Sequence, residues 1–182
     1  MCRIFNATFL PHKWYYYKTT VGEADGINNN SDAEFVERHA DTVYKLALSR
    51  TKDPSAAADV FQEAFYRYFK KRPAFVSDEH GKAWMIRVTI NCSNNFLGSL
   101  WRKKTVPLGE VTGEQPPHEY SGLLDEVMRL PRRYRTVICL FYYEGLRVSE
   151  IAAVTGTKES TVKSHLHRAR IMLKERLVGY EF

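Results

Sequence analysis

Hydrophobic side chains recur at helical spacing through most of the chain that follows residue 30. The clearest stripe runs from Ser55 to Lys71, where apolar and aromatic residues follow one another at intervals of three and four. Its members are Ala57, Val60, Phe61, Ala64, Phe65 and Tyr68. A weaker stripe between Ser31 and Asp53 stops before Pro54, because proline lacks the backbone N–H that a helix interior needs. The pattern predicts two amphipathic helices, with Ser55 as the N-cap of the second.

A third helix is expected from Lys82 to Trp101, after a loop of sequence RPAFVSDEHG at residues 72–81. Residues 105–121 follow, and they are rich in proline and glycine without apolar periodicity, which is typical of a flexible linker between domains. Residues 1–30 are aromatic at first and then rich in glycine and asparagine. They are expected to form a disordered extension, a docking segment or an upstream stretch from an early start codon.

The segment beyond the linker contains two helices divided at Leu130–Pro131, then a short helix, a turn at Gly156, and a longer helix from Glu159 to Leu177. Glycine suits the turn because a positive φ costs it little. No run alternates at period two for long enough to predict a strand. We therefore expect an all-α fold of two small helical domains, residues 31–104 and 122–182, joined by a flexible linker.

A short helix, a glycine turn and a longer basic helix form the pattern of a helix-turn-helix, which places its second helix in the major groove of DNA. A step of roughly 100° per residue puts polar side chains on the outward face of that helix. These are Ser160, Lys163, Ser164, His167 and Arg168. Lys and Arg donate to phosphate oxygens and guanine acceptors, and serine donates or accepts. The alternatives for such a helix are a solvated basic surface and a coiled-coil arm.

The charge balance agrees with an anionic partner, since 27 Lys and Arg outnumber 21 Asp and Glu and give a formal net charge of +6. The cysteines, Cys2, Cys92 and Cys139, are too far apart to predict a disulfide framework or a zinc site. His165 and His167 point to different sides of one helix, so no metal site is expected there, and no cofactor is predicted. No apolar run approaches the roughly 18 residues that cross a bilayer. We expect no membrane insertion and a cytoplasmic protein.

Three stretches carry a family resemblance. EGLRVSEIAAVTGTKESTVKSHLHRARIML, preceded by LPRRYRTVICLFYY, resembles region 4 of a bacterial sigma factor of the extracytoplasmic-function (ECF) type. In the first domain, DVFQEAFYRYFK at residues 59–70 resembles region 2.2, and KAWMIRVTINCSNNFLGSLWRKK at residues 82–104 resembles regions 2.3 and 2.4. The resemblance covers about residues 32–177, with both domains in the family's order.

The resemblance implies that region 2.2 docks on the β′ clamp helices of core RNA polymerase. It also implies that the chain makes a second contact with the polymerase, at the β flap. In this chain the polar face opposite the apolar stripe would make the clamp contact. Its residues are Asp59, Gln62, Glu63 and Tyr66. The residues alone leave an ordinary solvated face as the alternative. Metal binding or acid–base chemistry by these carboxylates is not expected, because no second acidic or histidine cluster completes a site.

The third helix carries an asparagine stripe in register with a basic side chain, although asparagine is a poor helix former. The stripe consists of Arg87, Asn91, Asn94 and Asn95. These side chains can donate to and accept from the edges of unpaired bases. The resemblance implies that this region melts and recognises the −10 promoter element, with a flipped base held near a loop that maps to Phe75–Gly81. The alternative is a tolerated polar surface, and for Trp84 a core position is the favoured interpretation.

The sequence departs from the family pattern at the helix-turn-helix. Arg147 and Lys158 stand where Ser or Thr usually caps the two helices, and each missing cap is expected to cost about 1 kcal/mol. His165 stands where arginine is common, which removes a permanent charge beside the recognition helix. These changes put the −35 preference in doubt and leave the fold intact.

The sequence thus predicts a sigma factor that performs no chemistry itself, and that combines duplex recognition by the second domain with single-strand capture by the first. The resemblance also implies control by an anti-sigma factor. One alternative is a stand-alone helix-turn-helix regulator, which requires a dimerisation surface or ligand pocket in residues 32–104. The other is a DNA-cleaving or phosphoryl-transfer enzyme, for which the chain lacks a Walker loop, a metal site of paired carboxylates, or a nucleophile with its base.

Overall fold

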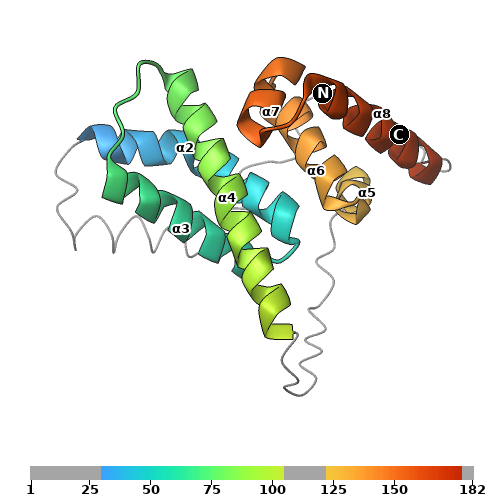
Figure 1. The fold of residues 1–182 in the computed structure, drawn as a ribbon, viewed down its shortest axis with the longest axis horizontal. Helices are drawn as coiled ribbons and strands as arrows, with labels where there is room; N and C mark the ends of the chain where they lie inside the picture. Colours follow the sequence, from blue (N-terminus) through green and yellow to red (C-terminus); the bar gives the residue numbers. More distant parts are fainter. Residues whose placement is uncertain (1–29, 105–121, 178–182) are drawn as a thin grey trace. The chain divides into compact units, whose positions relative to one another are not determined.

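The computed structural model describes residues 30–104 and 122–177, and within these ranges every regular element is a helix (Figure 1). The first part of the chain forms α2 (Asn30–Thr51), α3 (Pro54–Lys71) and α4 (Asp78–Lys104). The second forms α5 (Leu123–Arg129), α6 (Arg132–Ile138), the π-helix η2 (Cys139–Tyr143), α7 (Val148–Thr155) and α8 (Glu159–Leu177). The all-α prediction is confirmed. The predicted linker and nearly all of the N-terminal extension lie outside the described residues.

Helix α3 begins at Pro54, one residue before its predicted cap, Ser55. Pro54 occupies the first turn, and Asp53 is the N-cap, since its Oδ1 accepts the backbone N–H of Ala56 at 2.5 Å. Ser55 was predicted as the cap and lies inside the helix instead. Asp53 is the better cap because its extended backbone aims the carboxylate at the free N–H groups of the first turn.

Helix α4 also begins before its predicted start at Lys82. Ser77 Oγ accepts the backbone N–H of His80 at 3.2 Å, and the first turn carries Asp78 and Glu79, which favour the positive end of the helix dipole. Most of the stretch Phe75–Gly81 is therefore the cap and first turn of a helix, where a loop was predicted. The cap followed by two acids is a sequence signal for this start.

An aromatic cluster fixes the remaining connection between α3 and α4. The rings of Phe75 and Trp84 lie 5.8 Å apart, and the rings of Tyr68 and Trp84 lie 6.4 Å apart. Tyr68 is buried, whereas Phe75 and Trp84 are half-buried. Trp84 thus packs against these rings but is only half-buried, whereas the favoured interpretation of the sequence was a core position.

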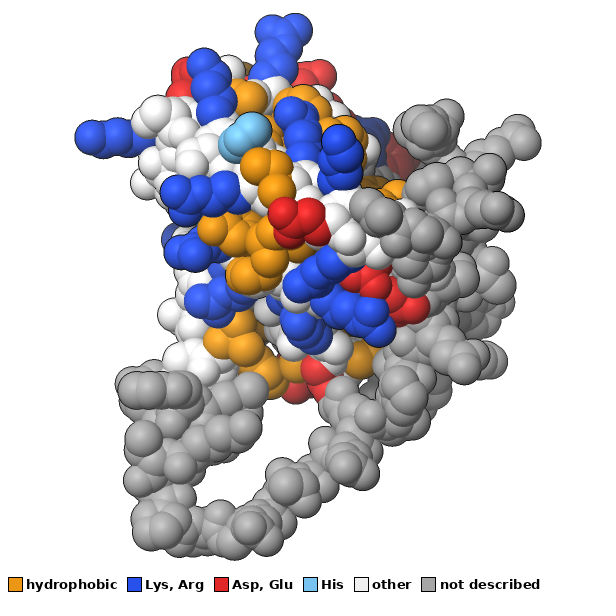
Figure 2. All heavy atoms as spheres, turned by 90° about the vertical axis from the view of Figure 1, so that its right-hand side faces the viewer, with side chains coloured by type: hydrophobic (Ala, Val, Ile, Leu, Met, Phe, Trp, Pro, Cys, Tyr) orange, Lys and Arg blue, Asp and Glu red, His pale blue; other side chains and the backbone are white. Residues whose placement is uncertain are grey.

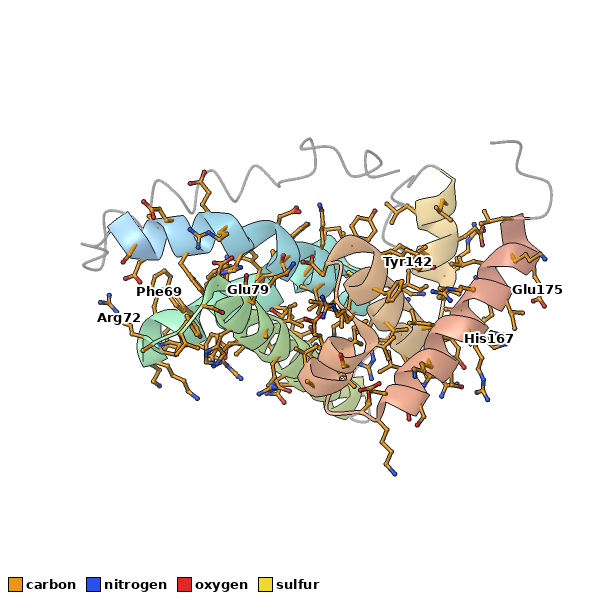
Figure 3. All side chains as sticks on the ribbon, turned by 90° about the horizontal axis from the view of Figure 1, so that it is seen from above. Phe69, Arg72, Glu79, Tyr142, His167 and Glu175 are labelled. Carbon is orange, nitrogen blue, oxygen red and sulfur yellow. The ribbon has the colours of Figure 1, made fainter. Side chains whose placement is uncertain are left out.

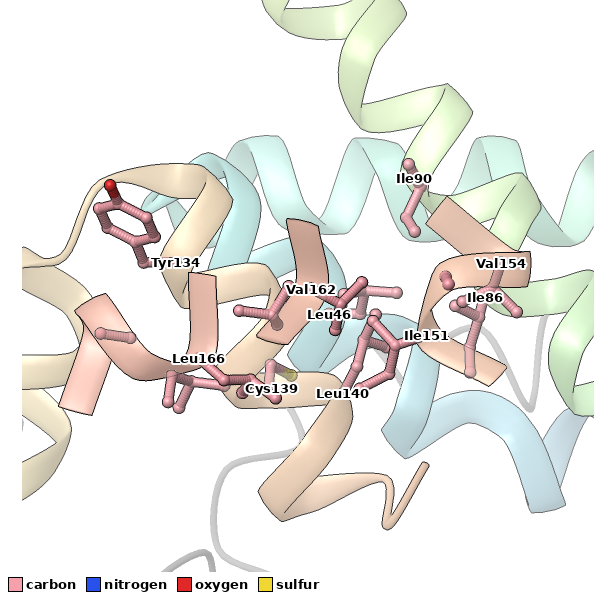
Figure 4. Close-up of a cluster of buried hydrophobic side chains, with 14 of the residues drawn as sticks. Leu46, Ile86, Ile90, Tyr134, Cys139, Leu140, Ile151, Val154, Val162 and Leu166 are labelled. Atoms are coloured by element: carbon pink, nitrogen blue, oxygen red, sulfur yellow. The ribbon is translucent and has the colours of Figure 1, made fainter. Parts of the chain in front are cut away.

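The hydrophobic cluster of the second part is built on α6, α7 and α8 (Figure 4). Leu140, Ile151, Val162 and Leu166 are each at most 3% exposed and lie among its central members. Val162, Leu166 and Ala169 form the buried side of α8. The same cluster continues into the first part of the chain through Leu46 of α2 and through Ile86 and Ile90 of α4.

The π-helix after α6 was not predicted. Its wider turn is closed by the N–H of Glu144, which donates to the carbonyl of Cys139 at 3.2 Å. Cys139 and Leu140 stay buried, while Tyr142 and Tyr143 are 54% and 41% exposed. Arg170 of α8 donates to the hydroxyl of Tyr142 at 2.9 Å, so the exposed ring is tied to the recognition helix.

Arg135 of α6 is fully buried and bonds to backbone carbonyls instead of carboxylates. Its guanidinium donates to the carbonyls of Leu130 at 2.6 Å and Met128 at 3.0 Å, and also to that of Ser49. These carbonyls stand at the ends of α5 and α2, where a helix leaves its last acceptors unpaired. Burial, with the nearby charge of Arg132, lowers the pKa of Arg135 to about 10, so the side chain stays charged at neutral pH.

Candidate nucleic-acid interface

The turn between α7 and α8 has helix-turn-helix geometry. Gly156 ends α7 in the left-handed region, at φ +67°, where an L side chain would be strained. The N–H of Thr157 then donates to the carbonyl of Ala152 at 3.1 Å. In α8, Val162 and Ala169 are fully buried, and α7 and α8 pack directly on each other. This packing fixes which side of α8 faces solvent.

All the residues predicted to contact duplex DNA lie on that solvent side. They are Ser160, Lys163, Ser164, His167 and Arg168, and each is exposed. Figure 3 shows where His167 projects from α8. Figure 2 shows that Lys and Arg side chains gather on the face of the molecule that contains α8. The structure thus presents these side chains together, and their contact with DNA stays a prediction.

The missing cap at Arg147 is partly replaced. A guanidinium has no acceptor for the first-turn N–H groups of α7, but the carboxylate of Glu150 accepts the backbone N–H of Arg147 at 2.6 Å. This is one half of a capping box. At the start of α8, the carbonyl of Lys158 accepts from the N–H groups of Thr161 and Val162, at 3.0 and 3.1 Å. The expected cost at Arg147 is therefore smaller than the sequence suggested.

Two residues of α6 that sequence reasoning missed lie against the recognition helix. The guanidinium of Arg133 stands 4.8 Å from the ring centre of Tyr134, and that ring meets the edge of His165 with 5.4 Å between centres. A hydrogen bond from Arg168 lowers the pKa of Tyr134, and Arg133 acts in the same direction. Partial burial, with the charges of Arg133 and Arg168, lowers the pKa of His165, so its imidazole is neutral at pH 7.

The predicted −10 stripe is exposed along α4 but is not free of contacts. All its members, Arg87, Asn91, Asn94 and Asn95, are exposed. Arg87 donates to the carbonyl of Ala153 at 3.2 Å. Asn94 accepts from Arg50 at 2.7 Å, and Arg50 also donates to Thr136 at 2.9 Å. Two of the stripe's side chains are therefore engaged within the chain in this structure.

The predicted polymerase face lies along α3. Asp59, Gln62 and Tyr66 are exposed, and Glu63 is half-buried in an ion pair with Arg67 at 2.7 Å. Asp59 and Glu63 also border a pocket of about 360 Å³ between α3 and α4. The pocket's lining is Asp59, Val60, Glu63, Arg67, Cys92, Asn95, Phe96 and Ser99. This face therefore borders a hollow with a mixed lining, in which Arg67 pairs with Glu63 and Val60 and Phe96 are apolar.

Cys92 in this lining is a buried thiol. Burial raises its pKa to about 11, which leaves almost no thiolate at neutral pH. Within residues 30–104 and 122–177, no three His, Cys, Asp or Glu side chains are grouped to hold a metal ion. In the same ranges no helix is long and apolar enough to cross a membrane.

Comparison with protein-family profiles matches both parts of the chain. The profile for Sigma-70 region 2 matches residues 35–103, and that for Sigma-70, region 4 matches residues 122–173. Together the two matched segments span about two thirds of the sequence.

Similar proteins that are named as sigma factors agree with these profiles. The chain is similar to RNA polymerase sigma-E factor of Streptomyces coelicolor, with 31% identity over 80% of this chain and 85% of that protein. It is also similar to RNA polymerase sigma factor SigV of Bacillus subtilis, with 28% identity over 76% of this chain and 86% of that protein. Another relative at 30% identity is ECF RNA polymerase sigma factor SigL of Mycobacterium tuberculosis, with 76% of this chain and 86% of that protein covered.

Among solved structures, the fold resembles sigma factor RpoE in its complex with the anti-sigma factor NepR from Bartonella quintana. The TM-score is 0.68 with 19% identity, over 84% of this chain and all of that chain. CnrH in complex with the cytosolic domain of CnrY gives a TM-score of 0.59 with 20% identity, over 85% of this chain and 92% of that one. At these identities the likeness concerns the fold.

Proposed function

The chain belongs to the ECF class of the sigma-70 family of RNA polymerase sigma factors, and we propose that it binds core RNA polymerase and directs it to a restricted set of promoters. The observation that carries this proposal is the presence, in one chain and in the family's order, of an exposed asparagine stripe on α4 and an exposed basic recognition helix. A regulator that works without polymerase would not need region 2, the part proposed to dock on polymerase.

The recognition helix is the part that would select the −35 element as duplex DNA. Lys163 and Arg168 have the donors that guanine edges and phosphates accept, and Ser160 and Ser164 add short polar side chains on the same exposed face. Because the buried side of α8 is fixed by Val162 and Ala169, the helix would enter the groove in one orientation.

Helix α4 would capture the −10 element after melting. Asn91 and Asn95 are exposed, and amide side chains can donate to and accept from bases that have lost their partners. Arg87 and Asn94 would have to exchange their bonds with Ala153 and Arg50 for bonds to DNA. Single-strand capture would therefore change contacts within the chain.

Helix α3 would dock on the β′ clamp helices through Asp59, Gln62, Glu63 and Tyr66, and region 4 would contact the β flap. Asp59 and Gln62 of this face are exposed polar side chains that a partner helix could contact. A site of action beside polymerase and DNA places the protein in the cytoplasm. The similarity of its fold to sigma factors solved with anti-sigma factors supports control by such an inhibitor.

The test is transcription in vitro with core polymerase and a genomic promoter library. We expect start sites that appear only when the chain is added, and loss of those starts when Asp59 and Glu63 are both changed to alanine. Glu175→Ala, which removes an exposed carboxylate from α8, is the control and should leave initiation unchanged. A library without any start that depends on the chain would refute the proposed function.

A further inference from the structure

Two arginines from different helices converge on one buried tyrosine. Arg133 of α6 stacks on the ring of Tyr134, with 4.8 Å from its guanidinium carbon to the ring centre. Arg168 of α8 acts on the phenol oxygen of the same residue and lowers its pKa. The tyrosine is only 5% exposed, whereas both arginines are exposed. Tyr134 thus lies buried beside the two arginines, whose side chains are exposed to solvent.

Among the described residues, neither arginine of this pair has a carboxylate as an ion-pair partner, whereas Arg129 and Arg176 both pair with the buried carboxylate of Glu126, at 2.5 and 3.8 Å. The lowered pKa of the neighbouring His165 keeps its imidazole mostly neutral, so it adds little further positive charge to the pair. Two like charges held close together repel each other, and an anion placed between them removes that repulsion.

We propose that Arg133 and Arg168 form a clamp for one DNA phosphate beside the groove that α8 enters, and that Tyr134 positions both guanidinium groups. This rests on the proposed function, since it assumes that α8 contacts duplex DNA. A phosphate suits the pair because guanidinium groups donate two parallel hydrogen bonds to such oxygens. DNA is the favoured source because Arg168 stands on the same exposed face as Lys163 and Ser164. Arg133 is thereby added to the DNA-binding residues.

The test measures how salt affects binding of the full chain to a short fluorescent DNA duplex of random sequence. Each phosphate contact contributes about 0.9 to the slope of log affinity against log salt concentration. Arg133→Ala should reduce the slope by about that amount and weaken binding equally for all sequences. Arg132→Ala is the matched control, because it removes one positive charge from the adjacent position. The charge of Arg132 acts on the buried residues Arg50 and Arg135, and Arg132 is not part of the proposed clamp.

Tyr134→Phe tests the positioning role, because it keeps the ring and both arginine charges and removes only the hydroxyl. We expect a several-fold loss of affinity in the wild-type background and no further loss in the Arg168→Ala background. Circular dichroism and thermal unfolding of each variant report whether the fold is retained. If the penalty of Tyr134→Phe persists without Arg168, the tyrosine acts through packing and the positioning claim is refuted.

The clamp is refuted if Arg133→Ala and Arg132→Ala change the slope equally, or if the wild-type chain does not bind the duplex. An acidic protein as the true occupant would appear as unchanged DNA binding in Arg133→Ala, and would equally refute it. The proposed function has a separate measure, initiation with core polymerase in the same protein preparation. If the clamp proposal is wrong, the chain should still support initiation with core polymerase. If the proposed function is wrong and no initiation is seen, the salt dependence of DNA binding can still be measured.

Discussion

The first turn of α3 depends on one side chain, Asp53, whose Oδ1 accepts the backbone N–H of Ala56. Asp53→Ala removes this acceptor, and Ala56 is only 8% exposed, so water cannot fully replace it. Loss of an N-cap costs about 1 kcal/mol, and loss of a negative charge at a helix N-terminus costs about 0.3–1 kcal/mol more. We expect the free energy of unfolding to fall by about 1.5 kcal/mol, and the thermal midpoint by about 3–6 °C.

The assay is urea or thermal unfolding followed by circular dichroism. Asp53→Asn keeps a hydrogen-bond acceptor and loses only the negative charge. Its free energy of unfolding should therefore fall by only about 0.3–1 kcal/mol. Ser55→Ala is the control, because the exposed Ser55 lies inside the helix and its loss should change stability by less than about 0.5 kcal/mol. If Ser55→Ala proved as costly as Asp53→Ala, or if Asn were no better than Ala at position 53, this explanation of the helix start would be wrong.

Three further outcomes are expected. Glu150→Ala should weaken the start of α7 and lower stability by about 0.5–1 kcal/mol, as measured by the same unfolding assay, whereas Glu159→Ala should have a smaller effect. Asn91→Ala should leave binding to closed duplex DNA unchanged, because unpaired bases exist only after melting. It should reduce the permanganate reactivity of thymines near the start site, and weaker duplex binding would contradict this division of roles. Cys92 should react with iodoacetamide far more slowly at pH 7.5 than a free thiol does, because its raised pKa, about 11, leaves little thiolate. Rapid labelling of Cys92 in the folded protein would refute its burial.

The helix-turn-helix could be predicted closely from sequence because strong local signals mark its parts. Gly156 supplies the turn, and the apolar spacing along α8 defines its buried side. The division at Pro131 has an equally local cause in the lost backbone N–H. The exposure of the predicted DNA-contact residues follows from the same spacing. Their chemistry toward DNA remains a prediction, as do the polymerase contacts of α3.

Other features depend on packing that no local pattern encodes. Apolar spacing does not separate an α-helix from a π-helix, so the wider turn at Cys139–Tyr143 gave no signal. Arginine is ordinarily an exposed residue, and nothing near Arg135 in sequence indicates that carbonyls from α2 and α5 would surround it. The contact of Arg133 and Tyr134 with α8 joins residues about thirty positions apart, which only the fold brings together.

The burial of Arg135 has a consequence for how the protein tolerates changes in acidity. Its partners are backbone carbonyls, which do not titrate, and its own pKa of about 10 lies well above neutrality. Because the pKa is lower in the folded than in the unfolded chain, the contribution of this group to stability begins to change only as pH rises through about 10, where it increases. Below that value the side chain carries its proton in both states. A junction built on a carboxylate would instead weaken within the acidic range, so Arg135 joins the ends of these helices with a strength that mild acid does not alter.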